Sequence, residues 1–133
     1  MYHYAFNLNI SFTKEVTLED IERALNIKST NFFPRDLNDR GVDTFYYQSI
    51  NYIDKEDPYI DETLEAFVKE IYPLLKNARN FLKEKEAEIS ICILYDNEED
   101  EDTKFEGYAV NARTIKLLAE LDASLDYCSY IAL

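Results

Sequence analysis

The stretch YAFNLNISF, residues 4–12, decides the fold. Large apolar side chains occur at every second position, at Tyr4, Phe6, Leu8, Ile10 and Phe12. Successive side chains of a β-strand point to opposite faces of a sheet, so a period of two indicates a strand with one buried face. We therefore expect a sheet that packs one face against a hydrophobic core.

Helical patterns follow this strand. The hydroxyl of Thr17 can cap a short helix that ends near Asn26, with acidic residues in its first turn. The longest helix is expected within Asp57 to Lys85, and a third helix over residues 112–125. Pro73 lies inside the longest pattern and has no backbone N–H, so a kink or break is expected there. The apolar face of the longest helix comprises Leu64, Phe67, Val68, Ile71, Leu74, Leu75, Ala78, Phe81 and Leu82.

Further strands are expected where β-branched and aromatic residues cluster between turn residues. They are residues 31–33, Thr44 to Asn51, Ile89 to Tyr95, Glu106 to Val110 and Tyr127 to Ile131. The resulting order is β-α-β-β-α-β-β-α-β. This order predicts a single α+β domain over residues 1–133, with a mostly antiparallel sheet and three helices on one face. A ferredoxin-like arrangement with added strands is the expected topology.

The charge balance excludes several classes of partner. The formal net charge is −13 at pH 7, which repels phosphate backbones and anionic membrane surfaces but attracts cationic partners. Direct nucleic-acid binding and membrane binding are therefore not expected. The first residues contain neither a basic segment nor an unbroken apolar run, so a cytoplasmic location is expected. Cys92 and Cys128 each lie in an apolar run and are expected to be buried thiols in a reducing compartment.

Residues that could carry catalysis are scarce. His3 is the single histidine, and Gly41 and Gly107 are the two glycines, with neither placed to open a phosphate-binding helix. Paired carboxylates would act as general acid and base only if burial shifted their pKa values. The candidates are Asp36 with Asp39 and Asp54 with Asp57. We expect no enzyme activity, no cofactor and no metal.

The segment from Asp96 to Asp102 is the most acidic part of the chain, with six carboxylates in seven residues. One interpretation is a solvated turn whose charge protects two strand edges from aggregation. A calcium site is disfavoured, because the segment lacks the alternating ligands and central glycine of an EF-hand. The third interpretation is a docking surface for a basic protein, formed by Asp96, Glu98, Glu99, Asp100, Glu101 and Asp102.

Tyrosines are the second unusual feature. Tyr46 and Tyr47 are adjacent in one expected strand, so they must point to opposite faces and one of them is expected on an uncovered face. Tyr52 lies just beyond the same run. These rings could belong to the core with their hydroxyl groups in water, or they could form an exposed protein interface, where tyrosine is enriched. Both interpretations remain open.

Several short motifs together resemble a known family. These are LNIKSTNFFPRDLNDRG at residues 25–41, FYYQSIN at residues 45–51 and TIKLLAELDASLDYCSY at residues 114–130. In spacing they are similar to the bacterial domain-of-unknown-function family DUF 4279 over nearly the whole chain. That family often has a tryptophan in the segment that here reads TFYYQSI, and this chain has none. The resemblance implies a small intracellular bacterial domain and supplies no catalytic residues.

These observations favour a non-enzymatic acidic binding protein. Its size, acidity and lack of catalytic groups suggest an immunity or inhibitor protein that masks a basic site on a toxin or nuclease. The alternative is a nucleic-acid mimic that inhibits a DNA-binding protein, which would need carboxylates in rows that match the phosphate spacing.

Overall fold

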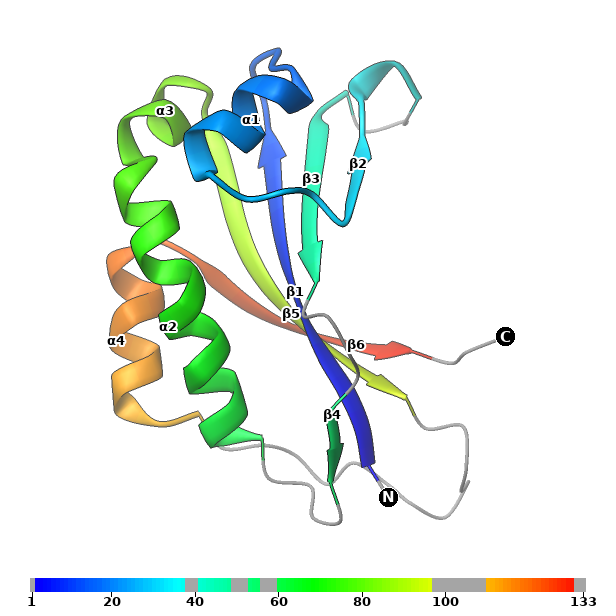
Figure 1. The fold of residues 1–133 in the computed structure, drawn as a ribbon, viewed down its shortest axis with the longest axis vertical. Coiled ribbons are helices and arrows are strands. Elements are labelled where there is room, and N and C mark those ends of the chain that lie inside the picture. The colour runs from blue at the N-terminus through cyan, green and yellow to red at the C-terminus, as the bar shows by residue number, and fades with distance from the viewer. Residues whose placement is uncertain (1, 38–40, 49–52, 56–59, 97–109, 131–133) are drawn as a thin grey trace.

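The computed structural model describes residues 2–37, 41–48, 53–55, 60–96 and 110–130 (Figure 1). Among them are four α-helices and six strands. The strands are β1 (Tyr2–Phe12), β2 (Asn31–Phe33), β3 (Asp43–Gln48), β4 (Ile53–Lys55), β5 (Ala87–Asp96) and β6 (Ser124–Tyr130). The helices are α1 (Leu18–Leu25), α2 (Asp61–Asn77), α3 (Arg79–Glu84) and α4 (Ala112–Glu120), with a short 3-10 turn η1 at Arg35–Leu37.

The described strands form one sheet in the order β2-β3-β1-β5-β6, and β4 also pairs with β1. All pairs are antiparallel except β5 with β6, which run parallel and are joined through α4. The four helices stand together on one side of this sheet (Figure 1). The predicted α+β class, the mostly antiparallel sheet and the one-sided helices are therefore confirmed.

The core lies between the helices and the face of β1 that the period-two pattern indicated. Tyr4, Phe6, Leu8, Ile10 and Phe12 are all fully buried. They pack with Ile91 and Ile93 of β5 and with helical residues that the sequence assigned to an apolar face, among them Leu64, Phe67, Val68, Ile71 and Leu75. Burial of these side chains is the main driving force for docking the helices on the sheet.

The short helix α1 follows its capping signals. The hydroxyl oxygen of Thr17 accepts a hydrogen bond from the backbone N–H of Asp20 at 3.2 Å. At the other end Asn26 adopts a left-handed conformation with φ of 58°, and its N–H bonds to the carbonyl of Glu22. Asparagine tolerates this conformation better than most residues, so it ends the helix here. Both expected ends of the helix are confirmed.

The longest helical segment differs from the expectation in where it breaks. Helix α2 continues through Pro73, and the break lies at Ala78, which separates α2 from α3. Pro73 is exposed, so the carbonyl of Lys69 that lacks its usual partner can bond to water. Ala78 is almost fully buried at 4% exposure, and the change of direction there lets Leu82 enter the same core. The burial of Ala78 and Leu82, and not the missing N–H of Pro73, determines where the helical segment breaks.

Two further details of the predicted topology change. A ferredoxin-like fold contains split strand–helix–strand units, in which another strand lies between the two parallel ones. Here the parallel strands β5 and β6 are direct neighbours, so the ferredoxin-like order is not confirmed among the described strands. The expected helix count of three becomes four because of the break at Ala78. The expected strand from Glu106 to Val110 lies outside the described residues except for Val110, which packs against the core.

The cysteine prediction is wrong. Cys92 is buried, as expected, but it forms a disulfide bond instead of remaining a thiol. The side chain of Cys128, the other cysteine of the sequence, lies outside the described side chains. Cys92 itself lies on β5, opposite Asp126 of β6 in the parallel register.

Candidate functional site

The described helices all lie on one side of the sheet and leave its second face uncovered (Figure 1). The most unusual described part of this second face surrounds Tyr46 of β3. We call this part the Tyr46 surface. It consists of Asn7 and Asn9 of β1, Asn31 and Phe33 of β2, and Tyr46 and Gln48 of β3.

Strand register assembles the Tyr46 surface from three segments of the chain. Asn9 pairs with Tyr46, and Tyr46 also pairs with Asn31, so these three residues form a row across β1, β3 and β2. Asn7 pairs with Gln48 in the adjacent row. The polar residues of the opening strand, which alternate with its apolar ones, thus become one half of a surface whose other half comes from residues 31–48.

Two aromatic rings form the apolar part of the surface. The rings of Phe33 and Tyr46 lie edge to face, with centroids 5.4 Å apart and an angle of 85° between their planes. Phe33 is 43% exposed, which is unusual for a large apolar side chain. A shallow depression of about 280 Å³ lies beside the pair, and Thr30 completes its lining. The rings present rigid apolar area next to polar groups.

Amides provide the polar part of the surface. The Asn7 side-chain N–H donates to the Oδ1 of Asn9 at 2.5 Å. The Oδ1 of Asn7 is buried and accepts no hydrogen bond from the part of the chain that is described. Side-chain amides carry both donors and acceptors, so they match the backbone of a partner protein, which also carries both. The side-chain amides carry no charge, so they can contact a partner through hydrogen bonds alone.

The charged side chains described on this face of the sheet are all acidic. Among strand positions with described side chains, the face holds the exposed carboxylates of Glu88 and Asp126 and neither lysine nor arginine. Asp96 is the last residue of β5 and pairs with His3 of β1. The remaining predicted acidic residues, Glu98 to Asp102, lie outside the described residues, as does Tyr52.

Tyr47 points to the covered face and is not part of the surface. Its ring stacks on Phe67 of α2, with centroids 6.4 Å apart and a 12° angle between the planes. Its hydroxyl donates to Glu70 at 3.0 Å. Burial and this bond to a carboxylate both raise the pKa of Tyr47, since each disfavours the phenolate. Tyr47 therefore connects β3 to α2, while Tyr46 takes the predicted place on the uncovered face.

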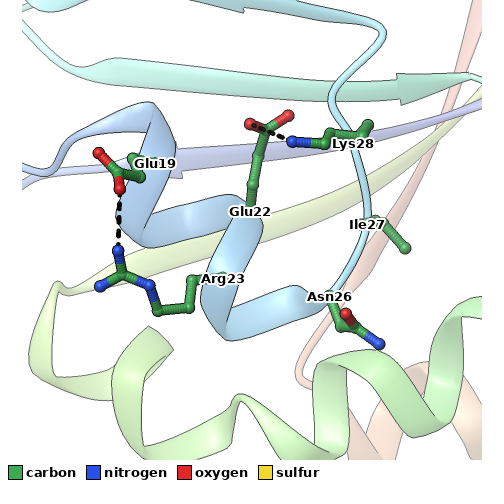
Figure 2. A pocket seen from close by; sticks show the side chains of 6 residues that line it. All are labelled: Glu19, Glu22, Arg23, Asn26, Ile27 and Lys28. Carbon is green, nitrogen blue, oxygen red and sulfur yellow. Dashed lines mark hydrogen bonds and ion pairs between the residues drawn. The ribbon is translucent and has the colours of Figure 1, made fainter.

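A second depression, of about 440 Å³, lies at the end of α1 (Figure 2). Its charges are paired within the protein: Arg23 bonds to Glu19 at 2.9 Å, and the Lys28 ammonium lies 3.7 Å from Glu22. Glu22 also accepts from the backbone N–H of Ser29 at 2.8 Å. These contacts fix the chain as it leaves α1 for β2, which is a structural role.

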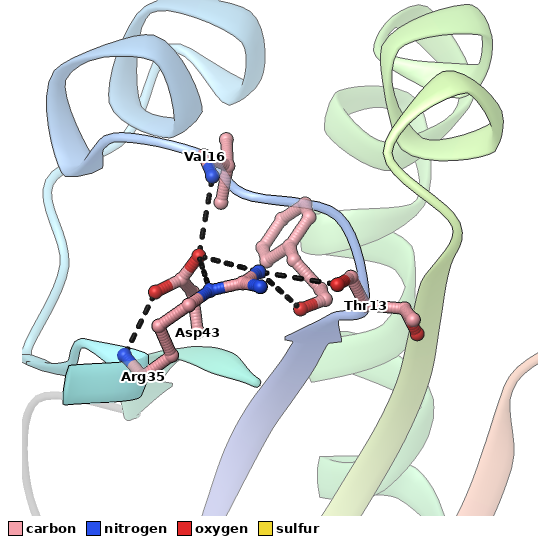
Figure 3. Close-up of polar contacts among 5 residues, drawn as sticks. Thr13, Val16, Arg35 and Asp43 are labelled. Carbon is pink, nitrogen blue, oxygen red and sulfur yellow. Dashed lines mark hydrogen bonds and ion pairs between the residues drawn. The ribbon is translucent and has the colours of Figure 1, made fainter. Parts of the chain in front are cut away.

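The sequence analysis did not predict the buried ion pair that Arg35 forms with Asp43 (Figure 3). The Asp43 carboxylate accepts hydrogen bonds from the backbone and guanidinium of Arg35 at 2.9 to 3.2 Å and from the Val16 N–H at 3.1 Å. The Arg35 guanidinium also donates to the carbonyls of Phe12 and Thr13. Burial favours the neutral acid, but the combined hydrogen bonds prevail and hold the pKa of Asp43 below its usual value. Spacing in the sequence gives no sign of this pair, because Asp43 starts β3 as an ordinary polar residue.

The predicted carboxylate pairs are not brought into a catalytic arrangement within the described residues. Asp36 is exposed, and Asp39 and Asp57 lie outside the described part of the chain, as does the side chain of Asp54. Over the residues that were placed, no cluster of three or more histidine, cysteine or acidic side chains has the geometry of a metal site. Likewise, none of the described helices is both long and apolar enough to span a bilayer.

Comparison with known proteins found no match to this chain among family models, curated proteins or solved structures. The resemblance to the DUF 4279 family therefore stays a prediction based on short motifs.

Proposed function

We propose that the protein is a non-enzymatic binding protein that recognises a basic partner protein with the Tyr46 surface. The observation that carries this proposal is an aromatic pair, Phe33 with Tyr46, set among side-chain amides on a sheet face without described cations. Tyrosine and asparagine are a combination that binding surfaces use often, because tyrosine gives rigid contact area and asparagine gives adaptable hydrogen bonds.

The charge distribution indicates that the partner is basic. The whole chain carries a formal charge of −13, and the uncovered face adds Glu88 and Asp126 beside the amides. The acidic segment begins at Asp96, the end of the strand that neighbours β1. Rim charges act mainly on the association rate, so these acids would attract a cationic surface while the Tyr46 surface supplies the short-range contacts.

The partner that fits best is a toxin or nuclease whose basic site the protein covers, which makes the protein an immunity or inhibitor protein. The high acidity and the aromatic and amide groups of the Tyr46 surface support this role, and the resemblance to a small bacterial domain agrees with it. A nucleic-acid mimic would use the same charge, but it would inhibit DNA-binding proteins through regular rows of carboxylates and would not depend on Phe33 and Tyr46.

The test is a comparison of three proteins as bait in extracts of the native host. They are the wild type, a double variant with Phe33→Ser and Tyr46→Ser, and an Ile115→Ser control. Ile115 lies on α4, on the helical side, and is 55% exposed, so its loss removes a similar apolar group elsewhere. Wild type and control should retain the same basic protein, and the double variant should bind it at least about tenfold more weakly. Equal retention by all three proteins refutes the Tyr46 surface as the binding site.

A second measurement addresses the acidic segment. Glu98, Glu99, Asp100, Glu101 and Asp102 are replaced by the corresponding amides, and association with the captured partner is followed at low and physiological salt. Slower association with a flatter salt dependence is expected, because both reflect long-range attraction. Equal association rates of wild type and variant at low salt would support the other interpretation, in which the segment is a solvated turn without a role in binding. Inhibition of nuclease or toxin activity by the wild type then separates an immunity protein from a general mimic, which would block unrelated DNA-binding proteins as well.

A further inference from the structure

A larger groove lies on the helical side of the molecule, away from the Tyr46 surface. It has a volume of about 720 Å³ and runs between helices α2 and α3 on one side and the end of α4 on the other. This is within the size range of small-molecule sites in proteins. Its apolar lining consists of Leu75, Leu82, Ala87, Ile89 and Leu121.

Three cations line the same groove, although the chain as a whole is strongly acidic. They are Lys76, Arg79 and Lys83, which occur at helical spacing along the end of α2 and in α3. The Lys76 ammonium lies 5.6 Å from the centre of the Tyr72 ring. None of the three cations forms a salt bridge with any residue placed in the structure.

Two of the three carboxylates that line the groove contact other groups of the protein. Glu120 accepts a hydrogen bond from the Tyr72 hydroxyl at 2.5 Å, which joins α2 to α4. Glu86 lies 3.9 Å from the ammonium of Lys14. Asp122 occupies the turn after α4 with φ of 52° and is the third acidic residue of the lining. Two of the three acids therefore interact with other groups of the protein, as does Lys76, whereas Arg79 and Lys83 form no salt bridge with a described residue and can meet an anion.

We propose that this groove binds a single-chain amphiphile with an anionic head group, a carboxylate or a phosphate. The apolar chain lies along the lining of Leu75, Leu82 and Ile89, and the head group meets Arg79 and Lys83. This is a second site, independent of the Tyr46 surface.

The composition of the groove fits both parts of such a ligand. An inorganic anion would pair with the cations but leave the apolar lining in contact with water. A neutral hydrocarbon would cover that lining but strip water from the cations without providing a counter-charge. An amphipathic anion satisfies both conditions, and the guanidinium of Arg79 can hold a carboxylate or phosphate with two parallel hydrogen bonds.

Titration calorimetry on the full chain tests the proposal with four probes: decanoate, decyl phosphate, decanol and inorganic phosphate. Each amphiphile is used below the concentration at which it forms micelles. Saturable one-to-one binding is expected for decanoate, for decyl phosphate or for both, and the tighter of the two identifies the head group. Decanol and inorganic phosphate should bind at least about tenfold more weakly. Binding of decanol as tight as that of both anions, or no binding of either anion, overturns the proposal.

Charge variants locate the site. The double variant Arg79→Gln with Lys83→Gln should weaken binding of the better anion at least about tenfold, and Arg79→Lys with Lys83→Arg should restore most of it. The matched control is Lys116→Gln, an exposed cation of α4 that does not line the groove. All altered side chains are exposed, so thermal unfolding should stay near the wild-type value. Unchanged affinity in the double variant, or an equal loss in the control, refutes this site.

Discussion

Tyr46 and Tyr47 are neighbours on β3, yet their rings contact opposite sides of the sheet. Tyr46 meets Phe33 on the uncovered face, and Tyr47 stacks on Phe67 beneath α2. The pleat of a strand requires this separation, because successive side chains alternate between faces. Adjacent residues of the same type therefore have different surroundings: Tyr47 packs between β3 and α2, and Tyr46 packs beside Phe33 on the other face.

The first prediction uses this contrast. Tyr47→Ala removes a partly buried stacked ring and its hydrogen bond to Glu70, so the free energy of unfolding should fall by about 2 kcal/mol, below the range for a fully buried aromatic residue. Tyr46→Ala should change stability much less. Urea denaturation of both variants measures the difference. If Tyr46→Ala destabilised the protein more than Tyr47→Ala, Tyr46 and not Tyr47 would be the tyrosine that stabilises the fold.

The second prediction concerns the helical side of the core. Leu75 is 2% exposed, so Leu75→Ala should lower the free energy of unfolding by about 2 to 5 kcal/mol. The control is Ile115→Ala, since Ile115 is 55% exposed and should change stability by no more than about 0.5 kcal/mol. Chemical denaturation at constant pH gives both values. A neutral Leu75→Ala variant would contradict the packing of α2 on the sheet.

The sequence was sufficient to predict the elements whose cause is local. The period-two pattern of the first strand and the apolar faces of the helices each reflect burial on one side, which periodicity reports directly. The capping signals at Thr17 and Asn26 likewise act within a few residues of one another. Strand order was less accessible, because it depends on how distant segments pair. Nothing local shows that β5 and β6 run parallel as neighbours.

The residues that the sequence reasoning missed are joined across long separations. Arg35 and Asp43 meet at the end of β1, where Arg35 also bonds to Phe12 and Thr13. The disulfide of Cys92 was not predictable either, because an apolar strand pattern does not report which cysteines meet. The Tyr46 surface was predicted in part: Tyr46 was identified, but its amide neighbours appeared only as the polar half of an alternating strand.

The third prediction follows from the helix that continues through Pro73. Pro73→Ala restores a backbone N–H that can bond to the carbonyl of Lys69, and the side chain at this position is exposed. Proline in a helix interior costs about 3 kcal/mol relative to alanine, but it also restricts the unfolded chain, which offsets part of that cost. The variant should therefore be more stable by about 1 to 3 kcal/mol. Thermal unfolding monitored by circular dichroism measures the change. A destabilised variant would show that the proline ring makes a contact that the fold requires.

The fourth prediction concerns the disulfide of Cys92. Reduction should lower the free energy of unfolding by about 2 to 4 kcal/mol, the typical range for a disulfide, because the bond restricts the unfolded chain. Urea denaturation with and without a phosphine reductant provides the measurement. The Cys92→Ala variant serves as the control, since its stability should not respond to the reductant. Equal sensitivity of variant and wild type would show that reduction acts elsewhere.

The fifth prediction concerns Arg35 and Asp43, whose ion pair is 3.0 Å long, with the Asp43 side chain 4% exposed. Asp43→Asn removes the charge that faces the guanidinium, so stability at neutral pH should fall by about 3 kcal/mol, the lower end of the range for breaking a buried pair. Asp36→Asn is the matched control. Asp36 neighbours Arg35 in η1 but is exposed, and its replacement should have little effect.

The pH dependence of the stability difference between wild type and Asp43→Asn shows whether the charge of Asp43 causes it. The pKa of Asp43 is lower in the folded protein than its ordinary value of 3.8, so the folded state binds this proton less readily than the unfolded state. The contribution of Asp43 to stability is therefore complete above the unfolded pKa and is lost as the pH falls through the lower, folded pKa. Denaturation curves at pH 7, 5, 4 and 3 should show a constant gap between wild type and Asp43→Asn down to about pH 5, and a shrinking gap below about pH 4. A gap that stays constant from pH 7 down to pH 3 would mean that Asp43 acts through its shape and neutral hydrogen bonds, and that its charge contributes nothing to the fold.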